Sequence, residues 1–195
     1  MSVPPVDLGP QTLTIARLAE AVRDEQLDAP TPCPDYAVGQ LLAHLAGLAA
    51  AFRDAARKEA GPTTDTPPGE VLPELEPGWR SVLPALLGEL AGAWRDPAAW
   101  EGGTRVGGVS LTGAVAGLVA VDELVVHGWD LARATGQEYA PDDEALRAAE
   151  RFLAQAAAEP TDGGGLFGPP VPVPDGAPLL DRVIALSGRD PRWTP

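Results

Sequence analysis

The chain contains two histidines, His44 and His127, and both lie in apolar stretches with helical spacing. Glu123 precedes His127 by four residues in the sequence DELVVHGWD. Residues four apart lie on one face of an α-helix, so this carboxylate and this imidazole can bind the same ion. A third ligand must come from another helix, and His44, in LLAHLAGL, is the natural donor. Two imidazole nitrogens and one carboxylate oxygen form the ligand set of many catalytic zinc sites, which keep a fourth position open.

A second interpretation treats both histidines as hydrogen-bonded core residues, with Glu123 as a helical partner of His127. Glu123 lies on the helix face that should point into the core, where an uncompensated carboxylate is costly to bury. A positive group must therefore meet it. The candidates are a metal ion, His127 in its protonated form, or an arginine such as Arg17 or Arg133.

Four further side chains near these residues have candidate supporting roles. A metal-bound imidazole needs an acceptor for its second nitrogen, and Asp130 or Asp122 can provide one, although both also fit as solvated or capping carboxylates. Trp129 either packs beside the site or fills the core. Cys33 lies in a proline-rich turn without a neighbouring base, so we interpret it as structural.

Composition and motifs exclude several classes of function. The chain has 28 acidic and 14 basic residues, and its formal net charge of -14 repels phosphate backbones and anionic lipid. We therefore expect no nucleic-acid partner and no membrane partner. The sequence has no phosphate-binding loop and no dinucleotide glycine fingerprint, and Ser110 lacks the GxSxG setting of a serine hydrolase.

The sequence indicates a protein of the cytoplasm. Residues 1–10 lack the basic and apolar regions of a secretory signal. The longest uncharged apolar run, residues 111–121, is too short to cross a bilayer. A single cysteine cannot form an intramolecular disulfide, which agrees with a reducing compartment. We expect a soluble, cytoplasmic monomer or homodimer.

Helical periodicity predicts the elements that must position the candidate ligands. Asp35 is expected to cap the second helix, and Gly136 to end the fourth in the left-handed conformation. Ser110 or Thr112 can cap the fourth helix, which should be the most buried because it is apolar nearly all round. Pro84 requires a kink or a break in the third. The four principal helices are expected at residues 11–26, 36–59, 78–94 and about 111–135.

The expected fold class is all-α, a four-helix bundle with ligands projecting inward from facing helices. Residues 61–77 carry five prolines and are expected to form a loop that is long enough to be either a lid, which would partly cover the ligand cleft, or a mobile connector. A turn and a short extended stretch should precede the fourth helix, and short helices should follow it at 142–157 and 178–186. We expect one domain over residues 1–195, with the bundle at about 11–157 and an irregular Pro- and Gly-rich tail at about 158–195.

Three segments together, TPCPDYAVGQLLAHL, DELVVHGWDLARATG and FGPPVPVP, resemble actinobacterial metal-binding proteins of the DinB-like superfamily. These proteins are related to the N-terminal domain of mycothiol-dependent maleylpyruvate isomerase, and the similarity extends over nearly the whole chain. The resemblance implies a four-helix bundle that holds a divalent metal, usually zinc, through His44, Glu123 and His127. Tyr36 stands where the first motif commonly has tryptophan.

The resemblance also implies a chemistry. Related members bind and deprotonate the thiol of mycothiol, or of another low-molecular-weight thiol, at the open metal position, and the thiolate then attacks an electrophile. The implied activity is that of a zinc-dependent thiol S-transferase or isomerase with mycothiol as co-substrate. Nickel, iron and manganese are the other candidate metals. We expect the chain to lack the additional C-terminal domain of the isomerase, which leaves the electrophilic substrate and the reaction open.

Two other functions compete with this one. In the first, the bundle binds a metal or a small ligand without catalysis, and the ion ties the second and fourth helices together. In the second, the same ligand set holds iron in an oxygenase. Nothing in the sequence favours the oxygenase.

Overall fold

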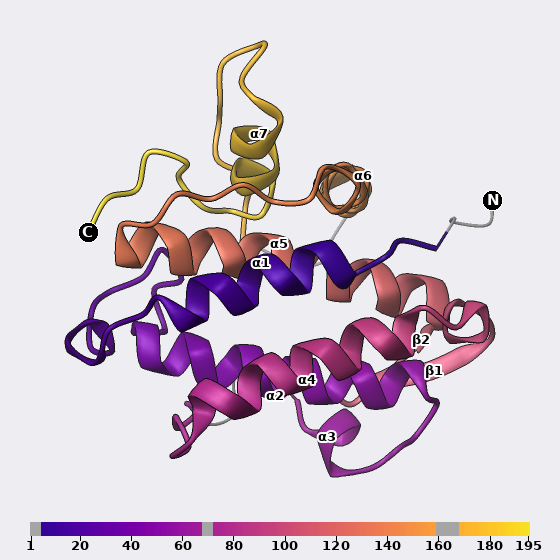
Figure 1. Ribbon diagram of the computed structural model, residues 1–195. Coiled ribbons are helices and arrows are strands. Elements are labelled where there is room, and N and C mark those ends of the chain that lie inside the picture. The colour runs from indigo at the N-terminus through magenta and orange to yellow at the C-terminus, as the bar shows by residue number, and fades with distance from the viewer. Residues whose placement is uncertain (1–4, 68–71, 159–167) are drawn as a thin grey trace.

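The computed structural model describes residues 5–67, 72–158 and 168–195, most of which are helical. In Figure 1, α1 and α5 form one layer of a bundle, and α2 and α4 form the other. The expected all-α, four-helix architecture is therefore confirmed. The four bundle helices are α1 (Gly9–Glu20), α2 (Val38–Ala56), α4 (Trp79–Trp94) and α5 (Gly113–Thr135).

Leucines that helical spacing directs inward form the core of the bundle. Burying one leucine side chain stabilises a fold by about 1.5–3 kcal/mol relative to leaving it in water, so this set dominates the packing energy. Fully buried leucines lie on three of the four bundle helices: Leu41, Leu42 and Leu45 on α2, Leu83, Leu87 and Leu90 on α4, and Leu124 and Leu131 on α5.

Within the described residues, no helix has the length and apolar character needed to cross a bilayer.

The first helix is shorter at its C-terminal end than the sequence predicts. It ends at Glu20 instead of Gln26, and residues Asp24–Gln26 form a separate 3-10 turn, η1. Arg23 has an extended backbone, with φ of -91° and ψ of 153°, which interrupts the helix before this turn.

The sequence predicts that Asp35 caps α2, but the structure shows that it does not. The helix begins at Val38, and the backbone N–H of Ala37 donates to Gln40 Oε1 at 2.8 Å. An antiparallel bridge between Pro30 and Ala37 keeps the preceding turn closed on itself, so the helix starts only after it.

A short helix lies in the described part of the connection between α2 and α4, where the sequence predicts only a loop. The helix α3 (Pro62–Asp65) lies inside this segment, and residues 68–71 of it are outside the described part of the chain. The α4 helix then continues through Pro84 from Trp79 to Trp94, without the break that this residue could have caused.

A β-hairpin leads into α5. After the 3-10 turn η2 (Pro97–Trp100), the strands β1 (Gly103–Val106) and β2 (Val109–Thr112) pair antiparallel, where the sequence predicts a single extended stretch. The Thr112 hydroxyl caps α5 by accepting the Val115 N–H at 3.3 Å, whereas the other candidate cap, Ser110, lies within β2.

As predicted, α5 is largely buried and ends at Gly136, which has a φ of 70°.

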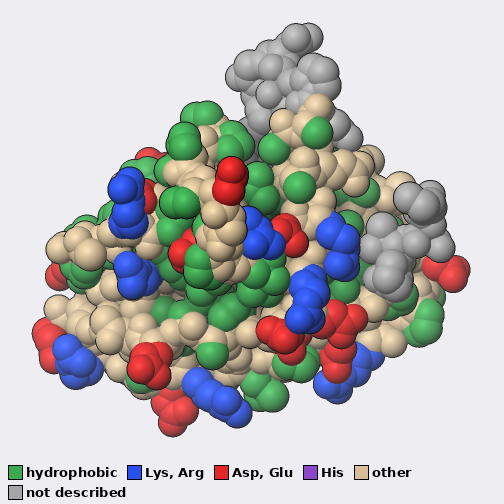
Figure 2. Space-filling view, turned by 90° about the horizontal axis from the view of Figure 1, so that it is seen from above, with side chains coloured by type: hydrophobic (Ala, Val, Ile, Leu, Met, Phe, Trp, Pro, Cys, Tyr) green, Lys and Arg blue, Asp and Glu red, His purple; other side chains and the backbone are tan. Residues whose placement is uncertain are grey.

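The chain after α5 packs onto the bundle. The helices α6 (Asp143–Ala158) and α7 (Leu179–Leu186) lie above α5 in Figure 1. On this face, which Figure 2 views directly, acidic and basic side chains lie next to one another among apolar ones. Within the predicted irregular tail, α7 lies where the sequence predicts a short helix at 178–186, and its Val183, Ile184 and Ala185 are buried. Residues 159–167 of the predicted tail are outside the described part.

Gly117 offers a test of the packing around α5. A Cβ at this position would lie 2.5 Å from Trp100 Cζ3, and the Trp100 indole is fixed by its hydrogen bond to the Trp94 carbonyl at 2.9 Å. We expect Gly117→Ala to lower the free energy of unfolding by about 1–3 kcal/mol, a typical cost of overpacking. Gly47→Ala is the matched control in α2, where the added methyl meets nothing within 4 Å.

In the control, the higher helix propensity of alanine should raise the free energy of unfolding by about 0.5–1 kcal/mol. Urea denaturation of both variants decides the matter. Equal effects in the two variants would contradict the described packing of Trp100 on α5.

Candidate metal centre

Three side chains from two helices meet between the layers of the bundle. His44 projects from α2, and Glu123 and His127 project from α5. Glu123 Oε2 lies 3.0 Å from His127 Nε2 and 3.7 Å from His44 Nε2. One donor atom from each residue lies within 4.8 Å of the other two. The structure thus brings together the three residues that the spacing selected, while metal binding by them stays a prediction.

Helix packing explains this convergence. Glu123 and His127 are one turn apart on α5, and Leu41 and Leu45 on either side of His44 are fully buried, which fixes α2 against its neighbours. The imidazole rings of His44 and His127 meet edge to face, with centroids 4.8 Å apart. The side chains of His44 and Glu123 are 22% and 27% exposed, against 8% for His127, so the cluster lies at the margin of the core.

The second ring nitrogen of His127 is held by Asp130. His127 Nδ1 lies 2.9 Å from Asp130 Oδ2, and this carboxylate is fully buried. The hydrogen bond requires a proton on Nδ1, because an ionised carboxylate can only accept. Asp130 therefore has the geometry predicted for an outer-shell acceptor. Asp122, the other candidate, makes no such bond: its Oδ1 is buried without a hydrogen-bond partner in the described structure.

Charge around Glu123 is balanced by the two imidazoles. Burial alone would raise the pKa of Glu123, but the neighbouring imidazoles of His127 and His44, at 3.0 and 3.7 Å, hold that pKa well below its ordinary value. Burial alone would lower the pKa of His127, yet hydrogen bonds to Asp130 and Glu123 raise it to about 9. With this pKa, a protonated His127 is a suitable positive partner for Glu123, and it is one of the groups that the sequence offered.

The predicted alternative partners of Glu123, Arg17 and Arg133, do not meet it. Arg17 lies exposed on α1, and Arg133 Nη2 donates to the Trp193 carbonyl at 3.0 Å. The guanidinium of Arg133 also lies 5.8 Å from the ring centre of Trp129, which is buried and does not line the pocket beside the ligands.

A pocket of about 200 Å³ adjoins the three candidate ligands. The turn before α2 forms one wall, where the Tyr36 ring lies 5.1 Å from that of His44. Burial raises the pKa of the Cys33 thiol, which keeps it protonated and agrees with our interpretation that it is no nucleophile. Besides the ligands, the pocket is lined by Cys33, Asp35, Tyr36, Asp122, Val126 and Arg189.

Two features of the pocket differ from what the sequence predicts. No described residue of the 61–77 segment lines it, because α3 packs against α2 and β1 instead. The wall that we expected from this segment comes from the turn before α2 and from Arg189. Sequence reasoning missed Arg189 because it lies 59 residues from its partner Asp130, and nothing in SGRDPRW distinguishes it from other surface arginines.

Comparison with known proteins finds a family match that spans the three candidate ligands. The family model of the mycothiol maleylpyruvate isomerase N-terminal domain matches residues 8–132. An uncharacterized protein of Mycobacterium tuberculosis, present in two strains, is 30% identical over 191 residues, which cover 91% of this chain and 92% of that protein. The family match confirms the resemblance drawn from the sequence motifs.

Solved structures share the fold. The mycothiol-dependent maleylpyruvate isomerase and a histidine-to-alanine mutant of it superpose with TM-scores of 0.53 and 0.55 at 18% and 17% identity. In both cases the similarity covers 76% of this chain and 69% of the other. At this identity, the comparison establishes a common architecture.

The raised pKa of His127 predicts a pH dependence of the metal-free protein. A pKa of about 9 in the folded state, against an ordinary 6.5, means that the ion pairs of His127 stabilise the fold fully below pH 6.5. This contribution, at most about 3 kcal/mol, is lost as the pH rises through 9. Urea denaturation in the presence of chelator, at pH 6 and pH 9.5, should show the loss.

His127→Gln is the reference for this measurement, since the difference between parent and variant isolates the histidine from other titrating groups. An NMR titration of the ring protons provides an independent readout, and the variant assigns the signal. A His127 ring that titrates at or below pH 6.5 in the metal-free protein would contradict the ion-pair geometry.

Proposed function

Because this chain belongs to the mycothiol maleylpyruvate isomerase N-terminal domain family, we propose that His44, Glu123 and His127 bind a divalent metal ion, with zinc as the first candidate. We further propose that a low-molecular-weight thiol of the mycothiol type binds in the adjoining pocket as co-substrate. The reaction is then an S-transfer or an isomerisation of an electrophilic small molecule. The convergence of the three donor atoms within 4.8 Å is the observation that carries the proposal.

The donor set fits a zinc-like ion. Zinc lies about 2.0–2.2 Å from nitrogen and oxygen ligands, so neighbouring donors in a tetrahedral site are about 3.4 Å apart. The distances of 3.0 and 3.7 Å from Glu123 Oε2 to the two Nε2 atoms lie on either side of this value. Three protein donors and an adjacent pocket correspond to an open site, whereas a closed structural site has four donors.

The side chains around the ligands fit this role. The hydrogen bond from His127 Nδ1 to Asp130 leaves the Nε2 lone pair directed at the donor cluster once the ring is neutral. Glu123 stays ionised at neutral pH because its pKa is well below the ordinary value. A bound divalent ion would lower the pKa of a thiol in its open position and supply thiolate at neutral pH.

The pocket wall is suited to an organic ligand with polar groups. Tyr36 and Val126 offer apolar surface, and Asp122 offers a buried carboxyl oxygen without a partner in the described structure. Burial raises the pKa of Asp122 well above its ordinary value, which favours a neutral carboxyl group that can donate a hydrogen bond to a ligand. This polar pocket favours the thiol-binding function over a bundle in which the ion has only a structural role.

Metal content tests the first part of the proposal. We expect the purified protein to bind close to one equivalent of zinc, and His127→Ala to weaken metal affinity by at least about 100-fold, because one of three donors is removed. Elemental analysis and competition with a chromogenic chelator provide the measurement.

Glu123→Gln should also weaken binding. Glu89→Gln is the matched control, since Glu89 is exposed on α4 and pairs with Arg53. Undiminished metal content in the His127 variant would end the proposal.

Thiol binding tests the second part. With Co²⁺ in place of zinc, we expect addition of mycothiol to produce a sulfur-to-cobalt charge-transfer band in the near ultraviolet, since the thiol takes the open position. Methylated mycothiol, which cannot form a thiolate, is the control. Tight metal binding without any spectral response to mycothiol would instead support the non-catalytic function, in which the ion contributes to folding.

A further inference from the structure

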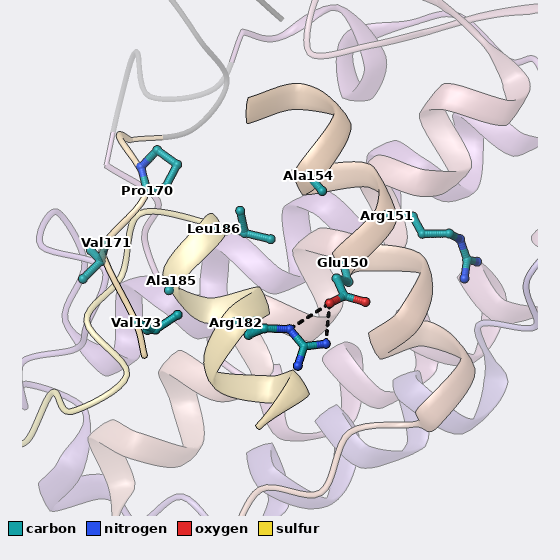
Figure 3. Close-up of a pocket in the computed structure, with 9 residues that line it drawn as sticks. All are labelled: Glu150, Arg151, Ala154, Pro170, Val171, Val173, Arg182, Ala185 and Leu186. Atoms are coloured by element: carbon teal, nitrogen blue, oxygen red, sulfur yellow. Dashed lines mark hydrogen bonds and ion pairs between the residues drawn. The ribbon is translucent and has the colours of Figure 1, made fainter. Parts of the chain in front are cut away.

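The described C-terminal residues 168–195, here called the C-terminal arm, are fastened to the bundle at two places. At the first, Arg182 of α7 donates to Glu150 Oε1 of α6 from Nε at 3.0 Å and from Nη2 at 2.6 Å, as Figure 3 shows. Around this ion pair, Val183 and Ile184 are buried. The arm is thus an ordered part of the fold, although it lies outside the segment that the family model matches.

At the second place, the arm reaches the candidate metal centre. Arg189 Nε lies 2.9 Å from Oδ1 and 3.0 Å from Oδ2 of Asp130, and its Nη1 donates to the Ser187 carbonyl at 3.3 Å. The Arg189 side chain is only 16% exposed, and that of Asp130 is fully buried. This contact extends the hydrogen-bonded chain from His127 through Asp130 to the arm.

Local backbone geometry directs Arg189 inward. Gly188 follows α7 with a φ of 84°, a conformation that favours glycine, and a Cβ there would lie 3.1 Å from the Cα of Gly168. The Arg189 N–H donates to the Ile184 carbonyl at 3.1 Å, which closes the end of the helix. The chain therefore turns back toward α5, where the Arg189 guanidinium contacts Asp130.

Charge balance gives this contact a specific role. The Asp130 side chain is fully buried, and Arg189 is the one arginine or lysine that the described structure pairs with it. The same carboxylate lies 2.9 Å from His127 Nδ1 and so orients the ring of a candidate ligand. An unpaired buried charge is strongly destabilising, so loss of Arg189 would disturb the carboxylate that holds this ring.

From these observations we infer that the C-terminal arm is a functional part of the candidate metal centre. Arg189 is a positioning residue that holds Asp130, and through it the ring of His127, in the orientation that binds the ion. The inference rests on the proposed function. By thermodynamic linkage, metal binding and docking of Arg189 on Asp130 stabilise each other.

Cobalt binding to four full-length proteins tests this inference. We expect Arg189→Gln to weaken Co²⁺ affinity by about 10–100-fold, the effect typical of outer-shell partners, and to alter the visible ligand-field spectrum. Arg189→Lys keeps the charge and should recover part of the affinity. Arg182→Gln is the matched control: it loosens the arm at its other attachment and leaves the Arg189–Asp130 contact in place, so its Co²⁺ affinity should equal that of the parent.

The outcomes separate the two proposals. Equal Co²⁺ affinities in the parent and Arg189→Gln, or equal losses in Arg189→Gln and Arg182→Gln, would overturn the role of Arg189 and leave the metal centre intact. A parent protein that does not bind Co²⁺ would overturn the metal centre itself.

If Arg189→Gln fails to fold by circular dichroism, Asp130→Asn replaces it, because an amide at position 130 removes the charge that Arg189 balances. Combining Asp130→Asn with Arg189→Lys should then add little to the loss caused by Asp130→Asn alone.

Discussion

The partial burial of one carboxylate, that of Glu123, organises this molecule. Glu123 lies on the inner face of α5, where the free energy cost of an isolated charge would be large. The fold meets that cost with two imidazoles from two helices, and those imidazoles fix how α2 and α5 approach each other at this level of the bundle.

Much of this arrangement can be predicted from the sequence because it is local. The spacing of Glu123 and His127 determines their common helix face, and a chain with one further histidine leaves a single nitrogen donor, His44, for a third position. The bundle itself follows from long amphipathic segments. The cap at Thr112 and the end at Gly136 are likewise short-range features that their residue types disclose.

Longer-range features could not be predicted in the same way. The bridge between Pro30 and Ala37 displaces the start of α2, and it forms between residues that have no periodic pattern. Arg189 reaches Asp130 because α6 packs on α5 and α7 packs on α6, an outcome of tertiary burial that no spacing rule contains. The family model likewise covers the locally predictable residues His44, Glu123 and His127 and ends before the C-terminal arm.

Asp122 has a further consequence for the electronic character of the site. It directly precedes Glu123 in the sequence. Burial, together with the neighbouring Glu123 charge, raises the pKa of Asp122 well above its ordinary value. The raised pKa favours the neutral form of Asp122, and Glu123 is the one acidic side chain among the three candidate ligands. In the proposed metal centre, one carboxylate and two neutral imidazoles would leave a dication with a formal charge of plus one. An Asp122 in its neutral form would not offset that charge, and the ion would keep more of its Lewis acidity.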